Sequence, residues 1–230
     1  MLPNPQGLYH PENEHDNCGA GFICSLEGKR TNDIIHKALD ILVKLEHRGA
    51  VSADGKTGDG AGILIDIPHD YLTTACSFEL PEPQSYALGM VFLPQKMNQR
   101  TFCTDVFEEE LHRQNLGIIG WRDVPTNYDV IGKIAAKTLP NIKQVFVKDE
   151  TGTLTEDQLN TKTYIARKRA EHRIYASKMS QASYFYLPSF STRTVIYKGL
   201  LMPEDIQGFY LDLKDPRVVT RLALVHQRFS

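Results

Sequence analysis

The sequence predicts an α+β fold in which helices are laid against layers of β-sheet. Strand-like apolar runs recur along the whole chain, a few helical segments separate them, and no repeat, low-complexity tract or Gly/Ser linker divides it. Many strands with few intervening helices are typical of layered sheet-and-helix domains. The expected strands span residues 19–26, 63–67, 86–93, 117–124, 142–149, 182–190, 192–199 and 221–230.

The first expected helix covers residues 33–49, where apolar residues recur at helical spacing. Thr31 or Asn32 can cap its start, and Gly49 can end it. Further helices are expected at 99–115, at 156–176 and in a short stretch near 203–213. The basic face of 156–176 is expected to be a solvated surface and not a binding stripe.

The strands are predicted from β-forming and alternating residues. Residues 19–26 are small and then apolar, whereas 182–190 and 192–199 alternate as paired strands do. A loop with four glycines in residues 55–62 precedes the second strand. It lacks the phosphate-binding pattern GxxxxGK(S/T), and a strand follows it in place of a helix. We therefore expect a tight turn with positive φ and close backbone approach.

The amino-acid composition and net charge argue against several classes of protein. Hydrophobic residues make up 41% of the 230 residues and charged residues 23%, with a formal net charge of −2. Without a concentrated basic face, nucleic acid is not an expected partner. No apolar run approaches the length of a membrane span. Residues 1–17 lack the basic and apolar regions of a secretory signal and are too acidic for a transit peptide, so a cytoplasmic location is expected.

The four cysteines are Cys18, Cys24, Cys76 and Cys103, and no two have CxxC spacing. A disulfide framework or a zinc site is not expected from so few, widely spaced cysteines. We expect Cys24, Cys76 and Cys103 to be small buried apolar residues in a reducing compartment.

Cys18 stands apart because it joins a polar leader to the first strand. The alternatives are a buried strand cysteine and a nucleophile. A cysteine–histidine hydrolase would need a histidine base, and the eight histidines follow no such pattern. Removal of residues 1–17 would instead give Cys18 a free α-amine, with a pKa of about 8 against about 8.5 for the thiol. Proton transfer between the two is nearly balanced, so the residue could activate itself.

Four stretches, in order along the chain, resemble a known family. They are "CGAGFI" (18–23), "LVKLEHRGAVSADGKTGDGAGILIDIPHDYL" (42–72), "SFSTRTVIYKGLLMPEDIQGFYLDL" (189–213) and "LALVHQRFS" (222–230). Together they resemble the amino-terminal class II glutamine amidotransferase domain of glutamate synthase large subunits, which belongs to the N-terminal-nucleophile hydrolases. "LEHRGA" and "HQRFS" are shared with class II amidotransferases in general, whereas "TGDGAG" and "STRTVIYKG" are similar to glutamate synthases in particular.

The resemblance implies a four-layer αββα sandwich, incomplete at its C-terminus, with residues 1–17 as a propeptide-like leader and 18–230 as the amino-terminal part of the domain. It also implies that Cys18 attacks the side-chain amide of glutamine and forms a thioester, releasing ammonia. Arg228 is expected to bind the α-carboxylate of the substrate, which suits a bidentate guanidinium. Arg48 is expected near the nucleophile in a positioning or structural role. Gln227 departs from the family, which often has Ser there.

No cofactor is expected on this segment, but the resemblance implies FMN and an iron–sulfur cluster in a full-length parent. The implied partners are glutamine, the remainder of a glutamate synthase chain, and an electron-donating small subunit or ferredoxin. Ammonia would then be used to make glutamate from 2-oxoglutarate. The family's oxyanion-hole segment "HNGE" does not occur in residues 1–230. Since each lost donor costs about 10²–10³ in rate, this chain alone is expected to be nearly inactive.

Two alternatives remain open. The chain could be a catalytically inactive regulatory or assembly domain of the same family. It could also belong to another class II amidotransferase, of the phosphoribosyl or glucosamine-phosphate type. "STRTVIYKG" and the long stretch between the glycine loop and that motif (86–181) count against the second alternative.

Overall fold

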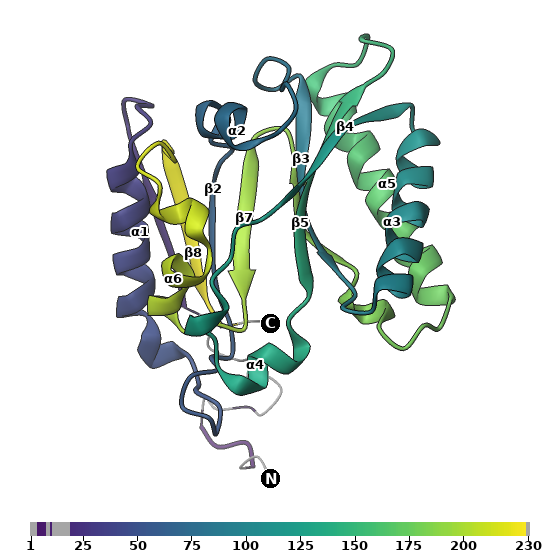
Figure 1. The fold of residues 1–230 in the computed structure, drawn as a ribbon. Coiled ribbons are helices and arrows are strands. Elements are labelled where there is room, and N and C mark those ends of the chain that lie inside the picture. Colours follow the sequence, from purple (N-terminus) through teal and green to yellow (C-terminus); the bar gives the residue numbers. More distant parts are fainter. Residues whose placement is uncertain (1–3, 8–9, 11–18, 229–230) are drawn as a thin grey trace.

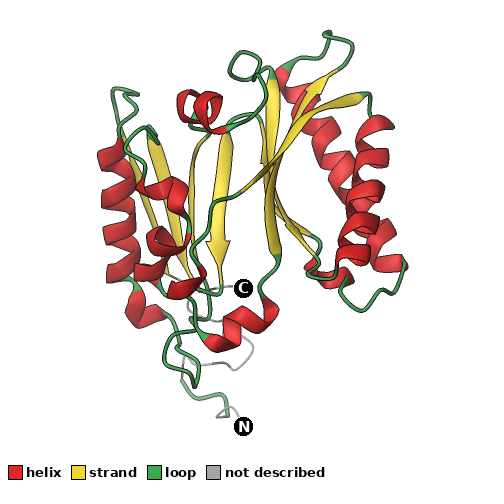
Figure 2. Cartoon of the chain, viewed as in Figure 1, coloured by secondary structure: helices red, strands yellow, loops and turns green. Residues whose placement is uncertain are grey.

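The computed structural model describes residues 4–7, 10 and 19–228, apart from the side chain of residue 48. This part of the chain forms two antiparallel four-stranded sheets flanked by helices, so the predicted α+β class is confirmed (Figures 1 and 2). In Figure 1 the layers follow one another as helix, sheet, sheet and helix, the order that the family resemblance implies.

The first sheet has the strand order β1-β8-β2-β7 and the second has the order β4-β5-β3-β6. The strands of the first sheet are β1 (Gly19–Cys24), β2 (Ala61–Asp66), β7 (Thr194–Gly199) and β8 (Leu222–Gln227). Those of the second are β3 (Tyr86–Leu93), β4 (Leu116–Asp123), β5 (Asn141–Asp149) and β6 (Tyr186–Ser191).

Helices connect these strands and cover the sheets. The α-helices are α1 (Asn32–Lys44), α2 (His69–Ala75), α3 (Met97–His112), α4 (Lys133–Thr138), α5 (Glu156–Ala176) and α6 (Ile206–Phe209). Short 3₁₀ turns are η2 (Glu46–Arg48), η3 (Tyr128–Val130), η4 (Ala182–Tyr184), η5 (Pro203–Asp205) and η6 (Leu211–Lys214). No helix in the described ranges is long and apolar enough to cross a membrane.

Helix α1 packs on the first sheet at β1 and β8. The two surfaces come close because Gly21 has no side chain, and a β-carbon there would collide with Ile41. The sheet face below α1 is buried through pairs such as Ile63 with Val225 and Ile65 with Ala223. This face and the inner face of the second sheet share one apolar core.

Helices α3 and α5 cover the outer face of the second sheet and form a separate apolar core with it. Phe107 on α3 lies at the centre of this core. Its ring makes edge contacts with the rings of Trp121, Phe185 and Phe190, at centroid distances of 5.8–6.2 Å. Such edge-to-face aromatic pairs stabilise a core beyond the area they bury.

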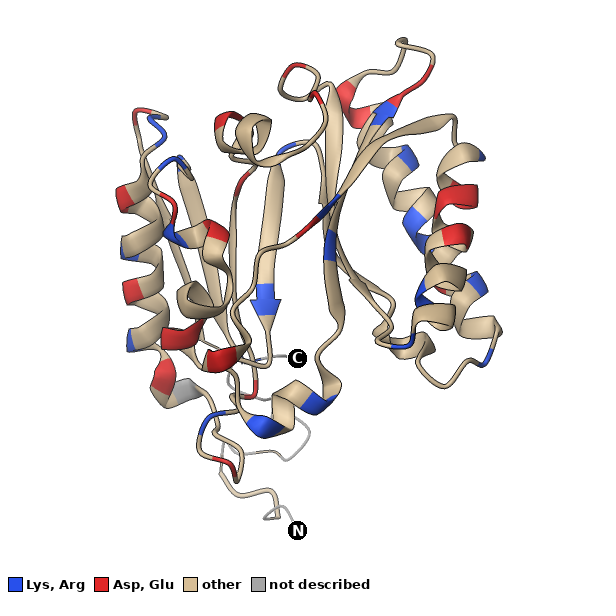
Figure 3. Cartoon of the chain, in the orientation of Figure 1, with Lys and Arg blue, Asp and Glu red and all other residues tan. Residues whose placement is uncertain are grey.

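Basic and acidic residues both occur on the two outer helices α3 and α5 (Figure 3), and several basic side chains of α5 pair with acidic ones. Arg169 and Arg173 reach the buried carboxylate of Glu110 on α3 at 2.6 and 2.8 Å. Arg167 pairs with Glu171 one turn along at 2.8 Å. The basic face of this helix is therefore compensated by acids, in agreement with the expected surface role.

One predicted strand pairing is absent from the described part of the structure. Residues 182–190 and 192–199 were expected to pair, but this is wrong: β6 pairs with β3 and β7 with β2, in different sheets. The chain crosses between the sheets at residues 191–194. There the Ser191 hydroxyl accepts from Arg193 N–H (3.0 Å), and the Ser189 hydroxyl accepts from Ile196 N–H (3.1 Å). These hydroxyls satisfy donors that a hairpin would have used.

Candidate functional site

Two of the predicted site residues, Cys18 and Arg228, are adjacent in the sequence to strand ends that the first sheet brings together. Gly19 pairs with Gln227 across β1 and β8, and Gln227 pairs with Ala61 across β8 and β2. Arg228 follows Gln227 directly, and Cys18 directly precedes Gly19. Cys18 itself lies outside the described residues, so its predicted role stays a prediction. The sheet nevertheless brings its sequence neighbour beside the neighbour of Arg228.

Arg228, directly after β8, has an unusual backbone conformation. Its φ is +84°, a left-handed region that non-glycine residues rarely adopt. The Arg228 N–H donates to the Gly60 carbonyl at 2.8 Å, which fastens the end of β8 to the glycine loop. Backbone strain of this kind clusters at functional sites, where the surrounding structure maintains it.

The Arg228 guanidinium lies against Asp59 of the glycine loop. The distance from Nε to Asp59 Oδ2 is 3.3 Å. Both Asp59 oxygens are shielded from solvent, and neither accepts a well-formed hydrogen bond from the described residues. The pairing is therefore one of charge, in which the carboxylate holds the guanidinium while retaining capacity to accept hydrogen bonds.

Gln227 is the second buried polar group here. Only 1% of the residue is exposed, and its Oε1 also has no hydrogen-bond partner within the described part of the chain. Its amide lies against Gly49, where a β-carbon would collide with it. Buried polar atoms are nearly always satisfied. The oxygens of Asp59 and Gln227 therefore retain capacity to accept hydrogen bonds at this site.

The glycine loop has the conformation that the sequence predicts. Gly55 and Gly60 have positive φ values of +68° and +132°. Gly58 packs directly on the main chain of Leu201, and a β-carbon there would collide with the Leu201 carbonyl. The glycines therefore serve a tight turn and close backbone approach.

Arg48 belongs to η2, directly before Gly49, but its side chain lies outside the described part. Its expected positioning role is thus a prediction. Sequence reasoning did not single out Asp59, although it stands within "TGDGAG". An acidic residue between two glycines of a tight loop was the available signal.

The other three cysteines differ in their burial, and burial bears on whether a thiol can act as a nucleophile. Burial raises the pKa of Cys76 to about 11 and that of Cys103 to about 12, so both thiols stay protonated at neutral pH. Cys103 is buried and Cys76 is half-buried. Cys24 was expected to be buried, but this is wrong: it is exposed. Strand alternation places Cys24 on the same face as Phe22, which α1 does not cover.

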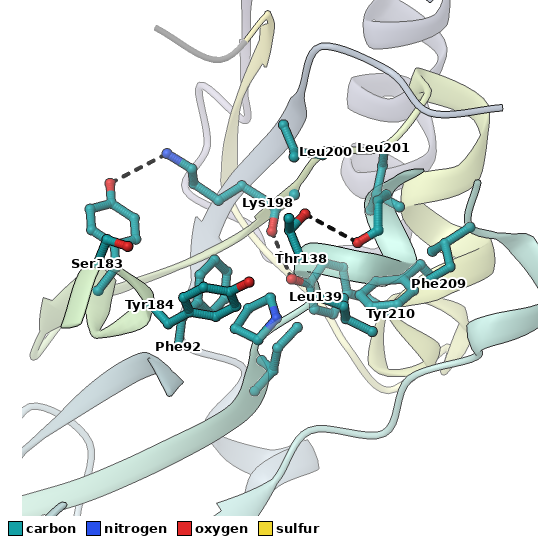
Figure 4. Close-up of a pocket in the computed structure, with 16 residues that line it drawn as sticks. Phe92, Thr138, Leu139, Ser183, Tyr184, Lys198, Leu200, Leu201, Phe209 and Tyr210 are labelled. Atoms are coloured by element: carbon teal, nitrogen blue, oxygen red, sulfur yellow. Dashed lines mark hydrogen bonds between the residues drawn. The ribbon is translucent and has the colours of Figure 1, made fainter. Parts of the chain in front are cut away.

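Two of the larger cavities border the first sheet. The larger, about 390 Å³, is lined by rings such as Phe92, Tyr184 and Phe209 and contains none of the predicted site residues (Figure 4). The smaller, about 250 Å³, lies over β2 and β8 and includes His226 and Arg228. We place the candidate site at the smaller cavity because Arg228 and its neighbours line it. No cluster of three metal-ligating side chains occurs among the described residues.

The fold and this arrangement agree with a comparison against protein families. Residues 18–230 match the family described as glutamine amidotransferases class-II, so the chain belongs to that family.

Individual relatives are similar over nearly the whole chain. The glutamate synthase (NADPH) large chain of Bacillus subtilis (strain 168) is 40% identical over 231 residues, which cover 100% of this chain and 15% of that protein. The ferredoxin-dependent glutamate synthase 2 of Synechocystis sp. is 39% identical, with 94% and 14% covered. The glutamate synthase (NADH) of Saccharomyces cerevisiae is 36% identical, with 100% and 11% covered. The chain thus spans about one seventh or less of the length of these relatives.

Proposed function

We propose that this chain is the glutaminase part of a glutamate synthase and that it releases ammonia from glutamine. The observation that carries the proposal is the meeting of β1, β8 and the glycine loop. There Gly19, the residue that follows Cys18, pairs with Gln227, and Arg228, with its Asp59 counter-charge, comes directly after Gln227. The matched family and the named relatives support the same reaction.

The proposed chemistry uses Cys18 as an N-terminal nucleophile after residues 1–17 are removed. Its α-amine takes the thiol proton, and the thiolate sulfur bonds to the side-chain carbonyl carbon of glutamine. The C–N bond then breaks, and the same amine returns a proton so that ammonia leaves. Water attacks the resulting thioester, the C–S bond breaks, and glutamate and the thiol are released.

Arg228 is proposed to bind the substrate α-carboxylate. A guanidinium offers two parallel N–H donors to a carboxylate, and its charge remains fixed at all working pH values. Asp59 holds the Nε side of the guanidinium at 3.3 Å, which orients the group. Arg48 is proposed to position the nucleophile.

In the proposed parent enzyme, ammonia aminates 2-oxoglutarate in the cytoplasm, with FMN and an iron–sulfur cluster held elsewhere. The relatives are named for NADPH, NADH and ferredoxin, so a small electron-donating subunit or ferredoxin is the proposed partner. Residues 18–230 are proposed to be the amino-terminal part of the amidotransferase domain. Since they contain no "HNGE" segment, residues 1–230 alone should turn over glutamine at least about 10²-fold more slowly than a complete domain.

The test uses the full polypeptide that the gene encodes. Its mature N-terminus should be Cys18, and a glutamine-analogue electrophile should label that residue. Cys18→Ser should abolish both labelling and glutamine hydrolysis, whereas Cys24→Ser, at an exposed cysteine six positions along the sequence, should leave them unchanged. A mature chain that still begins at Met1, or hydrolysis that survives Cys18→Ser, would refute the mechanism. An unlabelled, inactive full-length protein would favour a regulatory or assembly domain.

A further inference from the structure

We propose that Asp54 is a positioning residue for the glutamine site. It fastens the glycine loop to the first turn of α4 and thereby fixes Asp59 against Arg228. This inference rests on the proposed function and adds a residue outside the motif glycines.

Asp54 accepts four hydrogen bonds with its two carboxylate oxygens. Oδ1 accepts from the backbone N–H groups of Lys56 (3.1 Å) and Thr57 (2.8 Å). Oδ2 accepts from the Thr57 hydroxyl (2.7 Å) and from the Ile134 N–H at the start of α4 (2.9 Å). One carboxylate therefore closes the turn within the loop and also ties it to a segment about 80 residues away.

Thr57 extends this hydrogen-bond network into the buried part of the molecule. It is 2% exposed, and its hydroxyl accepts from the Ala135 N–H at 3.1 Å. Its carbonyl accepts from the Ser52 N–H at 2.8 Å. Gly132, just before α4, permits this approach because a β-carbon there would collide with Thr57. The loop and α4 are thus fitted to each other at several atoms.

The fastened turn leads directly to the site. After Thr57, Gly58 is wedged against the Leu201 main chain. The Asp59 N–H donates to the Ala50 carbonyl at 3.1 Å, and the Gly60 carbonyl accepts from Arg228 N–H. Only one residue separates Thr57 from Asp59. Loss of the hydrogen bonds to Asp54 should therefore change the position of the Asp59 carboxylate. The Arg228 guanidinium that this carboxylate holds should move with it.

The chain offers a matched control in Asp149. Its carboxylate accepts from Thr153 N–H (2.7 Å), Leu154 N–H (2.9 Å) and Thr151 N–H (3.1 Å), and from the Thr151 hydroxyl. It closes the same kind of Asp–Thr turn, but this turn follows β5 at the upper end of the second sheet in Figure 1, away from the C-terminal end of β8. If Asp54 served only to stabilise its own turn, the substitutions Asp54→Ala and Asp149→Ala would have equivalent effects on KM and on exchange.

The experiment compares Asp54→Ala, Asp54→Asn and Asp149→Ala in the full polypeptide, with glutamine hydrolysis and amide hydrogen exchange as readouts. Asp54→Ala should raise KM for glutamine about tenfold, equivalent to about 1.4 kcal/mol, with a smaller change in kcat. It should also speed exchange of the Arg228 N–H. Asp54→Asn should fall between, since its carbonyl oxygen still accepts from Lys56 and Thr57 while its NH₂ faces the Ile134 N–H.

Asp149→Ala should leave KM and Arg228 exchange within about twofold of the parent values. Equal effects of Asp54→Ala and Asp149→Ala, or unchanged exchange at Arg228 in Asp54→Ala, would overturn the proposal. Failure of the unsubstituted protein to hydrolyse glutamine would instead overturn the proposed function. The exchange readout would still decide whether Asp54 holds Arg228.

Discussion

The two sheets have four strands each, yet they are buried in different ways. Every residue of β3, in the second sheet, is buried, because helices cover one face and the first sheet packs towards the other. In the first sheet, one face is buried while residues of the other face remain open, with Phe22 60% exposed and Leu224 42% exposed. The candidate site lies at the ends of the strands of this less covered sheet. The second sheet is therefore the more fully packed scaffold, and the candidate site lies on the less covered first sheet.

The largest expected effect concerns Asp212, which joins the two sheets. Its carboxylate pairs with Arg122 of β4 at 2.7 Å, and accepts from Tyr71 (2.7 Å) and Tyr197 of β7 (3.1 Å). Asp212→Ala leaves the Arg122 charge buried without a counter-ion. The free energy of unfolding should fall by about 3–5 kcal/mol in urea titrations.

The double change Arg122→Met with Asp212→Leu is the control for Asp212. It removes both charges, so it should destabilise the protein much less than Asp212→Ala alone. If the single and double variants unfold at the same urea concentration, the Arg122–Asp212 pair is not what holds the sheets together.

Substitution of two leucines, one in each sheet, measures directly how differently the two sheets are buried. Leu187 of β6 is fully buried, whereas Leu224 of β8 is 42% exposed. Leu187→Ala should cost about 3 kcal/mol, because it removes apolar contacts and leaves a cavity. Leu224→Ala should cost less than about 1 kcal/mol. Equal shifts in the urea midpoints would mean that the open face of the first sheet is packed in solution.

Much of this architecture could be predicted from the sequence, and most reliably in the scaffold. The strand at 86–93 and the helix at 156–176 have the predicted bounds, since a continuous apolar run and a capped helix are strong local signals. Helices α2 and α4 were not predicted. They have seven and six residues, and so short a helix depends on tertiary contacts more than on its own sequence.

The sequence motifs singled out some residues of the candidate site and missed others. The motifs singled out Arg228, and in the structure it directly follows Gln227, which pairs with Gly19. Asp59 and Asp54 were not singled out because their importance depends on partners far away in sequence, Arg228 and Ile134. A carboxylate in a glycine-rich turn has the same local pattern whether or not such a partner exists.

The next prediction in order of size concerns how the stability provided by helices α3 and α5 depends on pH. Burial opposes ionisation of Glu110, but hydrogen bonds from Arg169 and Arg173 and the nearby positive charges outweigh it, so the pKa of this carboxyl lies below its ordinary 4.5. The ionised form therefore stabilises the fold above the unfolded-state pKa, and this contribution is lost as pH falls through the folded-state pKa. Glu110→Gln should cost about 2 kcal/mol at about pH 7, the scale of buried hydrogen bonds to a charged group.

As pH falls through the folded-state pKa of Glu110, the gap between the parent and Glu110→Gln should close, because the parent carboxyl becomes protonated as well. Glu109→Gln is the control on the same helix. Its carboxylate is 55% exposed and pairs with Arg173 at the surface, so its loss should cost less than about 1 kcal/mol at any pH. A gap for Glu110→Gln that persists in acid would show that packing, and not charge, makes this residue important.

The smallest expected change in the free energy of unfolding comes from a threonine at a helix start. Two such threonines are compared, one on each side of the molecule. Thr155 caps α5: its hydroxyl accepts from Gln158 N–H, and the Gln158 side chain accepts from Thr155 N–H, which completes a capping box. Thr31 occupies the same position at α1 but makes no side-chain cap. The neighbouring Asn32 instead donates to the Val218 carbonyl at 2.8 Å, which ties α1 to the segment before β8.

Thr155→Ala should therefore cost about 1 kcal/mol, whereas Thr31→Ala should cost only a few tenths of that, because it removes no hydrogen bond at the helix start. Paired urea titrations at one protein concentration resolve the difference. Equal costs would mean that α1 is capped in solution as α5 is, and that the two helical layers are stabilised alike. A larger cost for Thr155 would show that the scaffold helix is stabilised locally, whereas α1 depends on its contacts with the sheet that carries the site.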